Sequence, residues 1–227
     1  MKKLSSRSTG TRYTAKIFIL LFPLFFLLNS CLGINADIVL NQNGSGTLAL
    51  EYHIAKILDS LGTLDGNERW NTIPVGKADF ERTLERLPEM KLLSFSSKEN
   101  GKDLVIAAKM EFSSLQGLLG FLDASGQRSS YSGSSSSHSL LLTFTEGSGI
   151  ENASLDKLIA VISENYRVRM SMTFPREGSL SITDRQGMTG SPIRGSEITT
   201  QGKKVSCSFP LYEILASKEG INAVFRW

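Results

Sequence analysis

The sequence predicts an α+β fold: an antiparallel sheet of about eight strands, built from hairpins, with three or four short amphipathic helices on one face. Stretches of alternating apolar and polar residues come in pairs around turns rich in Gly, Asn and Ser. Between these pairs, apolar residues recur at the i, i+3, i+4 and i+7 spacing of a helix. The sequence contains no glycine fingerprint of a βαβ nucleotide-binding fold.

The first pair of strands lies directly after the amino-terminal region. Residues 37–41 and 47–53 flank a glycine-containing turn at 42–46, which is a β-hairpin pattern. Residues 54–61 then have the apolar spacing of a short helix. Residues 63–76 have no period and two turn glycines, so we expect a loop there.

A second hairpin follows a second helix, which is predicted to end at Pro88 because proline cannot continue a helix. Its strands are predicted at about 90–97 and 102–112, and the latter strand alternates strictly. Ser113 and Gln116 have the spacing of a capping box, which predicts the start of a third helix.

The second half of the chain opens with a serine-rich stretch. Residues 125–139 contain nine serines and two glycines and cannot bury enough apolar area to offset the entropy of ordering, so we expect a mobile loop or a poorly formed hairpin there. A strand is predicted at 140–145 and another at 166–174, with one apolar and one polar face. Between them, a helix is predicted whose inward face is Leu155, Leu158, Ile159 and Ile162.

The carboxyl-terminal segments complete a single domain over residues 37–227. A short strand at 180–182 and a Gly/Pro/Ser-rich loop at 184–197 precede a strand with Val205, Cys207 and Phe209 inward. A short helix at 211–217 and a strand at 221–227 follow.

The amino terminus has the features of a secretory signal. Residues 1–30 carry five basic residues and no acidic one, followed by an apolar run at 17–28 that is too short to span a bilayer. Leu28-Asn29-Ser30-Cys31 resembles the lipobox of bacterial lipoproteins. That resemblance implies cleavage after residue 30, a diacylglycerol thioether on Cys31, and a lipid-anchored linker at 31–36. Two or three long acyl chains would hold the protein on a membrane of the cell envelope, in a leaflet that the sequence does not identify.

Charge and composition exclude several function classes. The whole chain has 25 Lys and Arg against 22 Asp and Glu, but removal of residues 1–30 leaves 20 basic and 22 acidic residues. A near-neutral chain without a basic run lacks the charge that nucleic-acid binding needs, so no nucleic acid is expected as a partner. The sequence has no metal-ligand spacing, and we expect neither a metal nor a cofactor.

Catalytic candidates are few. A Ser–His mechanism would have to use His53 or His138, since these are the two histidines of the chain. His138 lies beside a run of serines, and His53 shares a strand face with Glu51. Both residues are also compatible with a solvated polar surface, and the sequence has no Gly-x-Ser-x-Gly elbow.

The sheet faces suggest a binding role. Methionine and aromatic side chains adapt to irregular apolar shapes, so those on the predicted strands could line a cavity for a lipid or another apolar molecule. These residues are Met110, Phe112, Tyr166, Met170, Met172 and Phe174. An ordinary core between sheet and helices explains the same pattern.

The segment from Cys31 to Ile54, with its lipidated cysteine and glycine-turn hairpin, resembles the start of LppM-like bacterial lipoproteins, including spirochaetal ones. The resemblance implies an extracytoplasmic α+β domain with an apolar, lipid-binding groove. Some members carry a transmembrane helix near the carboxyl end, whereas residues 200–227 here are amphipathic, so anchoring would rest on Cys31.

Three functions are therefore carried forward. The first is a membrane-anchored lipoprotein that binds a lipid or another apolar ligand. The second is a lipid esterase or phospholipase that uses a Ser–His pair. The third is a structural or partner-binding lipoprotein of the envelope.

Overall fold

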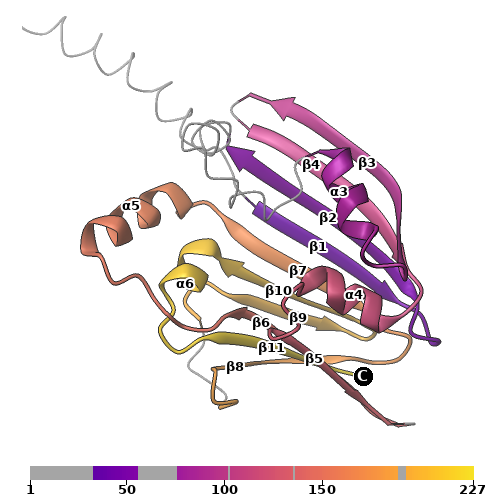
Figure 1. Ribbon diagram of the computed structural model, residues 1–227. Coiled ribbons are helices and arrows are strands. Elements are labelled where there is room, and N and C mark those ends of the chain that lie inside the picture. Colours follow the sequence, from indigo (N-terminus) through magenta and orange to yellow (C-terminus); the bar gives the residue numbers. More distant parts are fainter. Residues whose placement is uncertain (1–32, 56–75, 102, 135, 189–192) are drawn as a thin grey trace, which may run out of the picture. The chain divides into compact units, whose positions relative to one another are not determined.

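The computed structural model describes residues 33–55, 76–101, 103–134, 136–188 and 193–227. These residues form eleven strands and four short helices in an α+β arrangement, which confirms the predicted class (Figure 1). The strands are β1 (Gly33–Leu40), β2 (Gly46–Ala55), β3 (Met90–Asn100), β4 (Asp103–Phe112), β5 (Ser129–Gly133), β6 (His138–Thr145), β7 (Arg167–Thr173), β8 (Ser179–Thr183), β9 (Glu197–Gln201), β10 (Lys204–Pro210) and β11 (Ile221–Arg226). The helices are α3 (Lys77–Leu84), α4 (Leu115–Leu122), α5 (Ala153–Ser163) and α6 (Leu211–Ala216).

The strands form two sheets where the sequence predicted one. The seven-stranded sheet A has the order β3-β4-β2-β1-β7-β10-β9, and the four-stranded sheet B has the order β5-β6-β11-β8. Sheet B is antiparallel throughout, whereas sheet A contains one parallel pair, β1 with β7. Hairpin signals report only pairing between strands that are neighbours in sequence, so the β1–β7 pair could not be predicted from them.

A continuous core fills the space on the inner face of sheet A. The alternating residues Ile38, Leu48, Met110, Met172 and Phe209 are fully or almost fully buried there. Sheet B adds side chains from β6 and β11 to the same cluster. Because the two sheets share one core, the residues from Gly33 onward behave as one folding unit.

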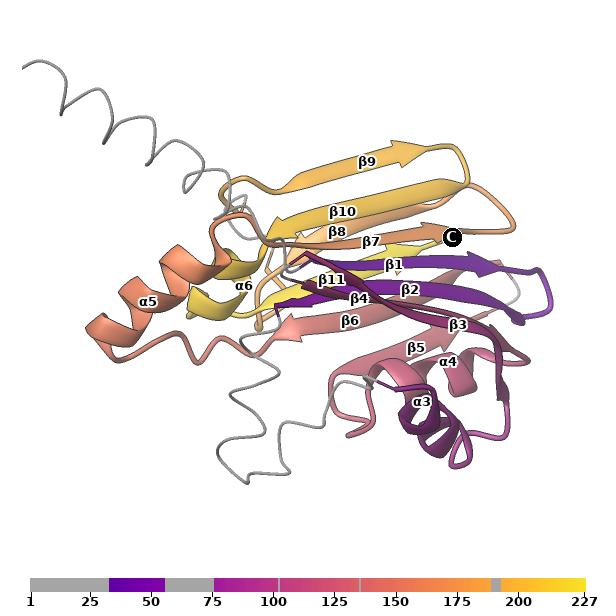
Figure 2. The same ribbon diagram turned by 90° about the horizontal axis from the view of Figure 1, so that it is seen from above.

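Three helices cover the same inner face of sheet A, as predicted. Phe80 of α3 packs against Phe95 with ring centroids 5.5 Å apart. Leu118 of α4 and Ile214 of α6 also belong to the core cluster. Helix α5 contributes no residue to that cluster and lies beside α6 in both views (Figures 1 and 2).

Local signals placed α4 well but misplaced its cap. The Ser114 hydroxyl, rather than that of Ser113, accepts a hydrogen bond from the Gly117 amide at 3.2 Å. Ser113 instead donates through its side chain to the Glu89 carbonyl, which joins the start of α4 to the α3–β3 connection. A cap at Ser114, one residue after the predicted position, still satisfies a free amide of the first turn.

Other boundaries also differ from the sequence prediction. Strand β1 begins at Gly33, so residues 33–36 of the expected linker are part of the sheet. Strand β2 runs to Ala55, and the remainder of the helix expected over 54–61 lies outside the described residues. Strand β9 (Glu197–Gln201) was not predicted: the sequence predicted a loop at 184–197 followed directly by the strand that is β10.

The serine-rich stretch at 125–139 contains strand β5, so of the two predicted alternatives the structure has the hairpin and not the mobile loop. Strand β5 pairs with β6 from Ser129 opposite Leu142 to Gly133 opposite His138. Tyr131 stacks with Trp227 at a centroid distance of 6.2 Å. Backbone pairing to a buried strand and one aromatic contact therefore order a segment whose other side chains bury little.

Candidate functional site

The outer face of sheet A carries a trough that crosses its strands. Strand pleating sends the core residues to one face of the sheet and every second residue to the other. The registers of the six strand pairs align these outward residues in two rows that cross all seven strands. The first row is Ser94, Lys109, Ala49, Asp37, Ser171, Ser206 and Thr199, and the second is Ser96, Ala107, Glu51, Asn35, Arg169, Ser208 and Glu197.

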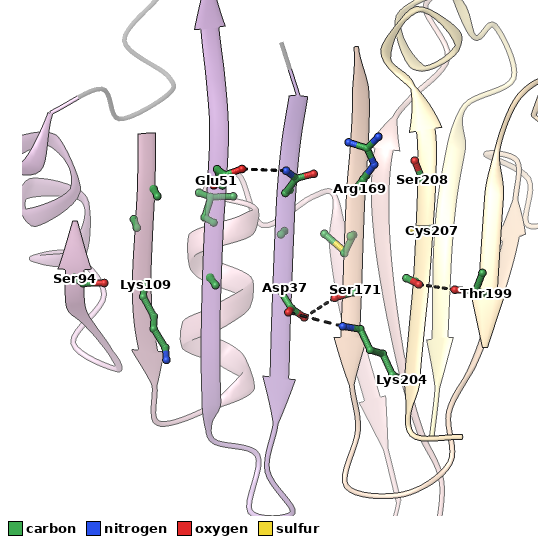
Figure 3. A pocket seen from close by; sticks show the side chains of 18 of the residues that line it. Asp37, Glu51, Ser94, Lys109, Arg169, Ser171, Thr199, Lys204, Cys207 and Ser208 are labelled. Atoms are coloured by element: carbon green, nitrogen blue, oxygen red, sulfur yellow. Dashed lines mark hydrogen bonds and ion pairs between the residues drawn. The ribbon is translucent and has the colours of Figure 1, made fainter. Parts of the chain in front are cut away.

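The trough has a volume of about 670 Å³ and is open to solvent along its length. Alanine and serine make up four of the seven residues in the first row and three of the seven in the second, and these short side chains leave parts of the floor of the sheet accessible. Lys204 lies at one border of the trough (Figure 3). A cavity of this size falls within the range of about 300–1,000 Å³ that is typical of small-molecule sites.

Each carboxylate of the trough has a partner. Asp37 accepts a hydrogen bond from the Ser171 hydroxyl and lies 3.9 Å from the Lys204 ammonium (Figure 3). Glu51 lies 3.5 Å from Nε2 of His53 and accepts a hydrogen bond from the Asn35 amide at 3.4 Å. The third carboxylate of the trough, that of Glu197 on the edge strand β9, pairs with Arg167.

Glu197 and Arg167 close the β9 side of the trough. An Nη atom of Arg167 lies 3.2 Å from a Glu197 carboxylate oxygen and donates to the Gly195 carbonyl at 2.8 Å. Nε of Arg167 donates to the Ser208 hydroxyl at 2.7 Å. Through Nε and one Nη atom, this guanidinium ties β7 to β10 and to the segment before β9.

Two cations of the trough have no such partner. Lys109 and Arg169 are exposed, and neither side chain forms an ion pair or hydrogen bond within the described part of the chain. Lys109 lies on β4 and Arg169 on β7, three strand positions apart, which corresponds to about 14 Å. The Asn35 side-chain oxygen, opposite Arg169 in the β1–β7 register, is buried and accepts no hydrogen bond. The trough thus presents positive charge at two points above a floor of small side chains.

The six residues predicted to line an apolar cavity lie mainly in the core. Each is at most 8% exposed, and five belong to the core cluster, with Tyr166 buried outside it. Of the six, Met170 alone also borders the trough. Their role as a ligand cavity stays a prediction, and their close packing explains why sheet A holds together at its centre.

His53 lies on the outer face of β2 beside Glu51, as the alternation predicted. Within the described residues, no serine hydroxyl is hydrogen bonded to its ring. The pair joins neighbouring positions of one strand face and carries no nucleophile.

His138 lies in an aromatic stack instead of a serine site. Its Nδ1 atom is 2.6 Å from the Tyr131 hydroxyl, and its ring stacks on Trp227 at 5.3 Å. These three residues border a second cavity of about 660 Å³. Among the described residues no serine side chain is hydrogen bonded to the His138 ring, and a catalytic role for His53 or His138 stays a prediction.

The two cysteines have different positions. Cys31 lies outside the described residues, so its expected acylation stays a prediction. Cys207 is buried between core residues of β10, and burial raises the pKa of its thiol to about 12. Within the described residues we find neither a cluster of His, Cys, Asp and Glu able to hold a metal ion nor a helix with the length and apolar character to cross a bilayer.

The sequence alone does not indicate that the residues of the trough lie on one sheet face. Lys109 and Arg169 were assigned to the polar faces of their strands, and serine at 171, 206 and 208 could be read in the same way. Only the pairing of β4, β2, β1, β7 and β10 brings them into two common rows. An excess of alanine and serine on polar strand faces was the available signal.

One solved structure that the chain matches is the folded domain of LppM from Mycobacterium tuberculosis, determined by NMR. The two chains are 16% identical and superpose with a TM-score of 0.40, and the match covers 86% of this chain and 90% of that chain. No protein-family model and no curated protein matches the chain.

Proposed function

We propose that the chain is a lipid-anchored protein of the bacterial cell envelope that binds an anionic amphiphile, such as a phospholipid, in the trough of sheet A. The lipobox at residues 28–31 supports the anchor, because acylation of Cys31 would attach the domain to a membrane. The trough supports the binding role.

The charge pattern of the trough carries the proposal. Every carboxylate there is paired, whereas Lys109 and Arg169 have no partner among the residues that the structure describes. An anionic group placed beside Arg169 would gain charge-assisted hydrogen bonds from a guanidinium that has no competing partner. Ala49 and Ala107 offer small apolar surfaces beside Lys109 for the rest of the ligand, and Glu51 and Asn35 lie between Ala107 and Arg169.

The trough is a better ligand site than the predicted set of methionine and aromatic residues. Met110, Phe112 and Met172 are completely buried, so an acyl chain could reach them only by displacing core contacts. The trough is already open and needs no such rearrangement. Binding there would keep the folding core intact.

Titration calorimetry with a short-chain phosphatidylglycerol, kept below its micelle concentration, tests the proposal. The purified protein is expected to bind it, and to bind a short-chain phosphatidylcholine about tenfold more weakly because the zwitterionic lipid has no net charge. Lys109→Gln/Arg169→Gln is expected to lose this preference. Arg86→Gln/Lys218→Gln removes two exposed charges outside the trough and should keep it.

Three results would oppose the proposal. Equal binding of both lipids, or equal loss in both double variants, would remove the trough cations from ligand recognition. Absence of binding to either lipid would favour a structural or partner-binding envelope protein. Hydrolysed lipid in the calorimeter cell after the titration would instead point to an esterase.

A further inference from the structure

Helix α5 carries its aliphatic side chains on the outside of the domain. The sequence predicted that Leu155, Leu158, Ile159 and Ile162 would face the core, and this was wrong for three of them. Leu155 is 48% exposed, Leu158 56% and Ile162 47%, and Val161 is 73% exposed. Together these four residues are called the α5 aliphatic face.

The side of α5 that faces the protein carries Asp156 and Ser163 together with the half-buried Ile159 and Ala160. Asp156 of α5 accepts a hydrogen bond from the Tyr212 hydroxyl of α6 at 2.9 Å, and Ser163 is buried at the carboxyl end of α5. At 100° per residue, Asp156 and Ser163 lie on one side of α5, whereas Leu155, Leu158, Val161 and Ile162 lie on the other. This is the reverse of an amphipathic surface helix, whose apolar stripe faces the core.

The anchor site and α5 lie at the same end of sheet A. In the parallel pair of β1 and β7, Gly33 lies opposite Arg167. Helix α5 ends at Ser163, four residues before Arg167, and Figure 1 shows it joining the start of β7. Cys31 precedes Gly33 by two residues, which span at most about 7 Å. Acyl chains on Cys31 would therefore enter a membrane close to α5.

The charges of α5 fit the same interpretation. Asp156 is engaged by Tyr212, so Lys157 is the other charged side chain of the helix, and the α5 aliphatic face itself carries no charge. Its contact with a membrane would depend on apolar burial at the boundary between headgroups and acyl chains, with little dependence on lipid charge.

We propose that α5 lies in the interface of the membrane that holds Cys31, with the α5 aliphatic face inserted among the lipids. This inference rests on the proposed anchoring at Cys31 and is independent of ligand binding in the trough. Two attachments at one end, the acyl chains and α5, fix the orientation of the domain. The β1–β2 turn and the β9–β10 turn then point away from the bilayer, because β1 and β7 run in the same direction.

Fluorescence quenching by nitroxide lipids tests this arrangement in the acylated full protein, reconstituted in phosphatidylcholine vesicles. A bimane label on Ser154→Cys reports on the outer side of α5 while all four aliphatic residues remain. The control label is on Lys203→Cys, in the β9–β10 turn at the other end of β7. Cys207 is buried and Cys31 would be acylated, so the introduced thiol is the one that reacts.

The Ser154 label is expected to lose about half of its fluorescence to nitroxides placed near the headgroups, and the Lys203 label to lose almost none. Leu158→Ser/Val161→Ser should abolish quenching at position 154 without lowering the melting temperature, because these exposed side chains support no core packing. Quenching that persists in this double variant would overturn the inference, as would a quenched label at position 203.

Flotation of the same vesicles separates this inference from the proposed anchor. If the protein floats, and Cys31→Ser does not, the anchor holds, and an unquenched label at position 154 then overturns the position of α5 alone. A label shielded from both nitroxide lipids and soluble iodide would mean that α5 is covered by a second copy or another protein. Failure of the parent protein to float would overturn the anchor and, with it, this inference.

Discussion

Gly33 lies opposite Arg167 in the parallel pairing of β1 with β7, which is the single parallel contact of sheet A within the described residues. This contact brings the start of the domain beside the end of α5 and places Asn35 opposite Arg169 and Asp37 opposite Ser171. The position of the anchor end and the assembly of the trough therefore depend on the same strand pair.

The β1–β2 hairpin requires glycine at position 46. A Cβ atom there would lie 2.0 Å from the Val39 carbonyl oxygen and 2.5 Å from a Phe112 ring carbon. We expect Gly46→Ala to destabilise the protein by about 2 kcal/mol or more, because backbone and core must move apart. Urea denaturation measures the change. Gly33→Ala, whose Cβ would lie 3.6 Å from the nearest atom, should be close to neutral, and an equal loss in both variants would contradict the explanation.

Trp227 joins the two sheets through stacked rings. The centroid of its indole lies 4.7 Å from the centroid of the Phe174 ring and 5.3 Å from that of the His138 ring. Trp227→Ala should cost about 3 kcal/mol of unfolding free energy, since it removes a large buried side chain. Thermal unfolding followed by circular dichroism gives the value. Arg226→Ala changes the exposed neighbour and should cost less than about 1 kcal/mol, so a similar loss there would argue against the stack.

The stability of the domain should fall at alkaline pH. Burial raises the pKa of Cys207 from 9.0 to about 12, so above pH 9 the unfolded thiol ionises while the folded thiol stays protonated. The protonated thiol does not change the free energy of unfolding below pH 9. Between pH 9 and about pH 12, that free energy falls by about 1.4 kcal/mol per pH unit. Burial and nearby Asp79 also raise the pKa of Tyr52, which adds to the loss above pH 10.

Cys207→Ala isolates this effect. Between pH 9 and 10 the variant should lose less stability than the parent protein, although it is less stable at pH 7. Urea midpoints at half-unit pH steps provide the comparison. Parallel curves for the two proteins would show that Cys207 is not the titrating group.

The trough should be blocked by one larger side chain on its floor. Ala49 lies between Lys109 and Asp37 in the first row and is exposed. Ala49→Leu is expected to weaken binding of phosphatidylglycerol by about tenfold or more while the melting temperature stays the same. Calorimetry and thermal unfolding measure the two quantities. Thr47→Leu, two residues earlier on β2 and outside the trough, should bind normally, and reduced binding there would count against the site.

The sequence by itself determined the α+β class, the β1–β2 and β3–β4 hairpins, α4 and α6, because these depend on local periodicity and turn residues. It also separated the inward and outward faces of β4 and β7, since alternation specifies which residues share a face. Local signals left β5 open between a mobile loop and a hairpin, and pairing with β6 orders this serine-rich segment.

Only the tertiary structure decided which faces meet. Apolar spacing in α5 shows that Leu155, Leu158 and Ile162 share a side of the helix, but whether that side meets the core depends on the Tyr212–Asp156 contact with α6. The trough likewise depends on strand order: Lys109 and Arg169 are 60 positions apart in sequence and are brought onto one sheet face, three strand positions apart, through long-range pairing. Pairing between distant strands is set by the whole core, which no local pattern encodes.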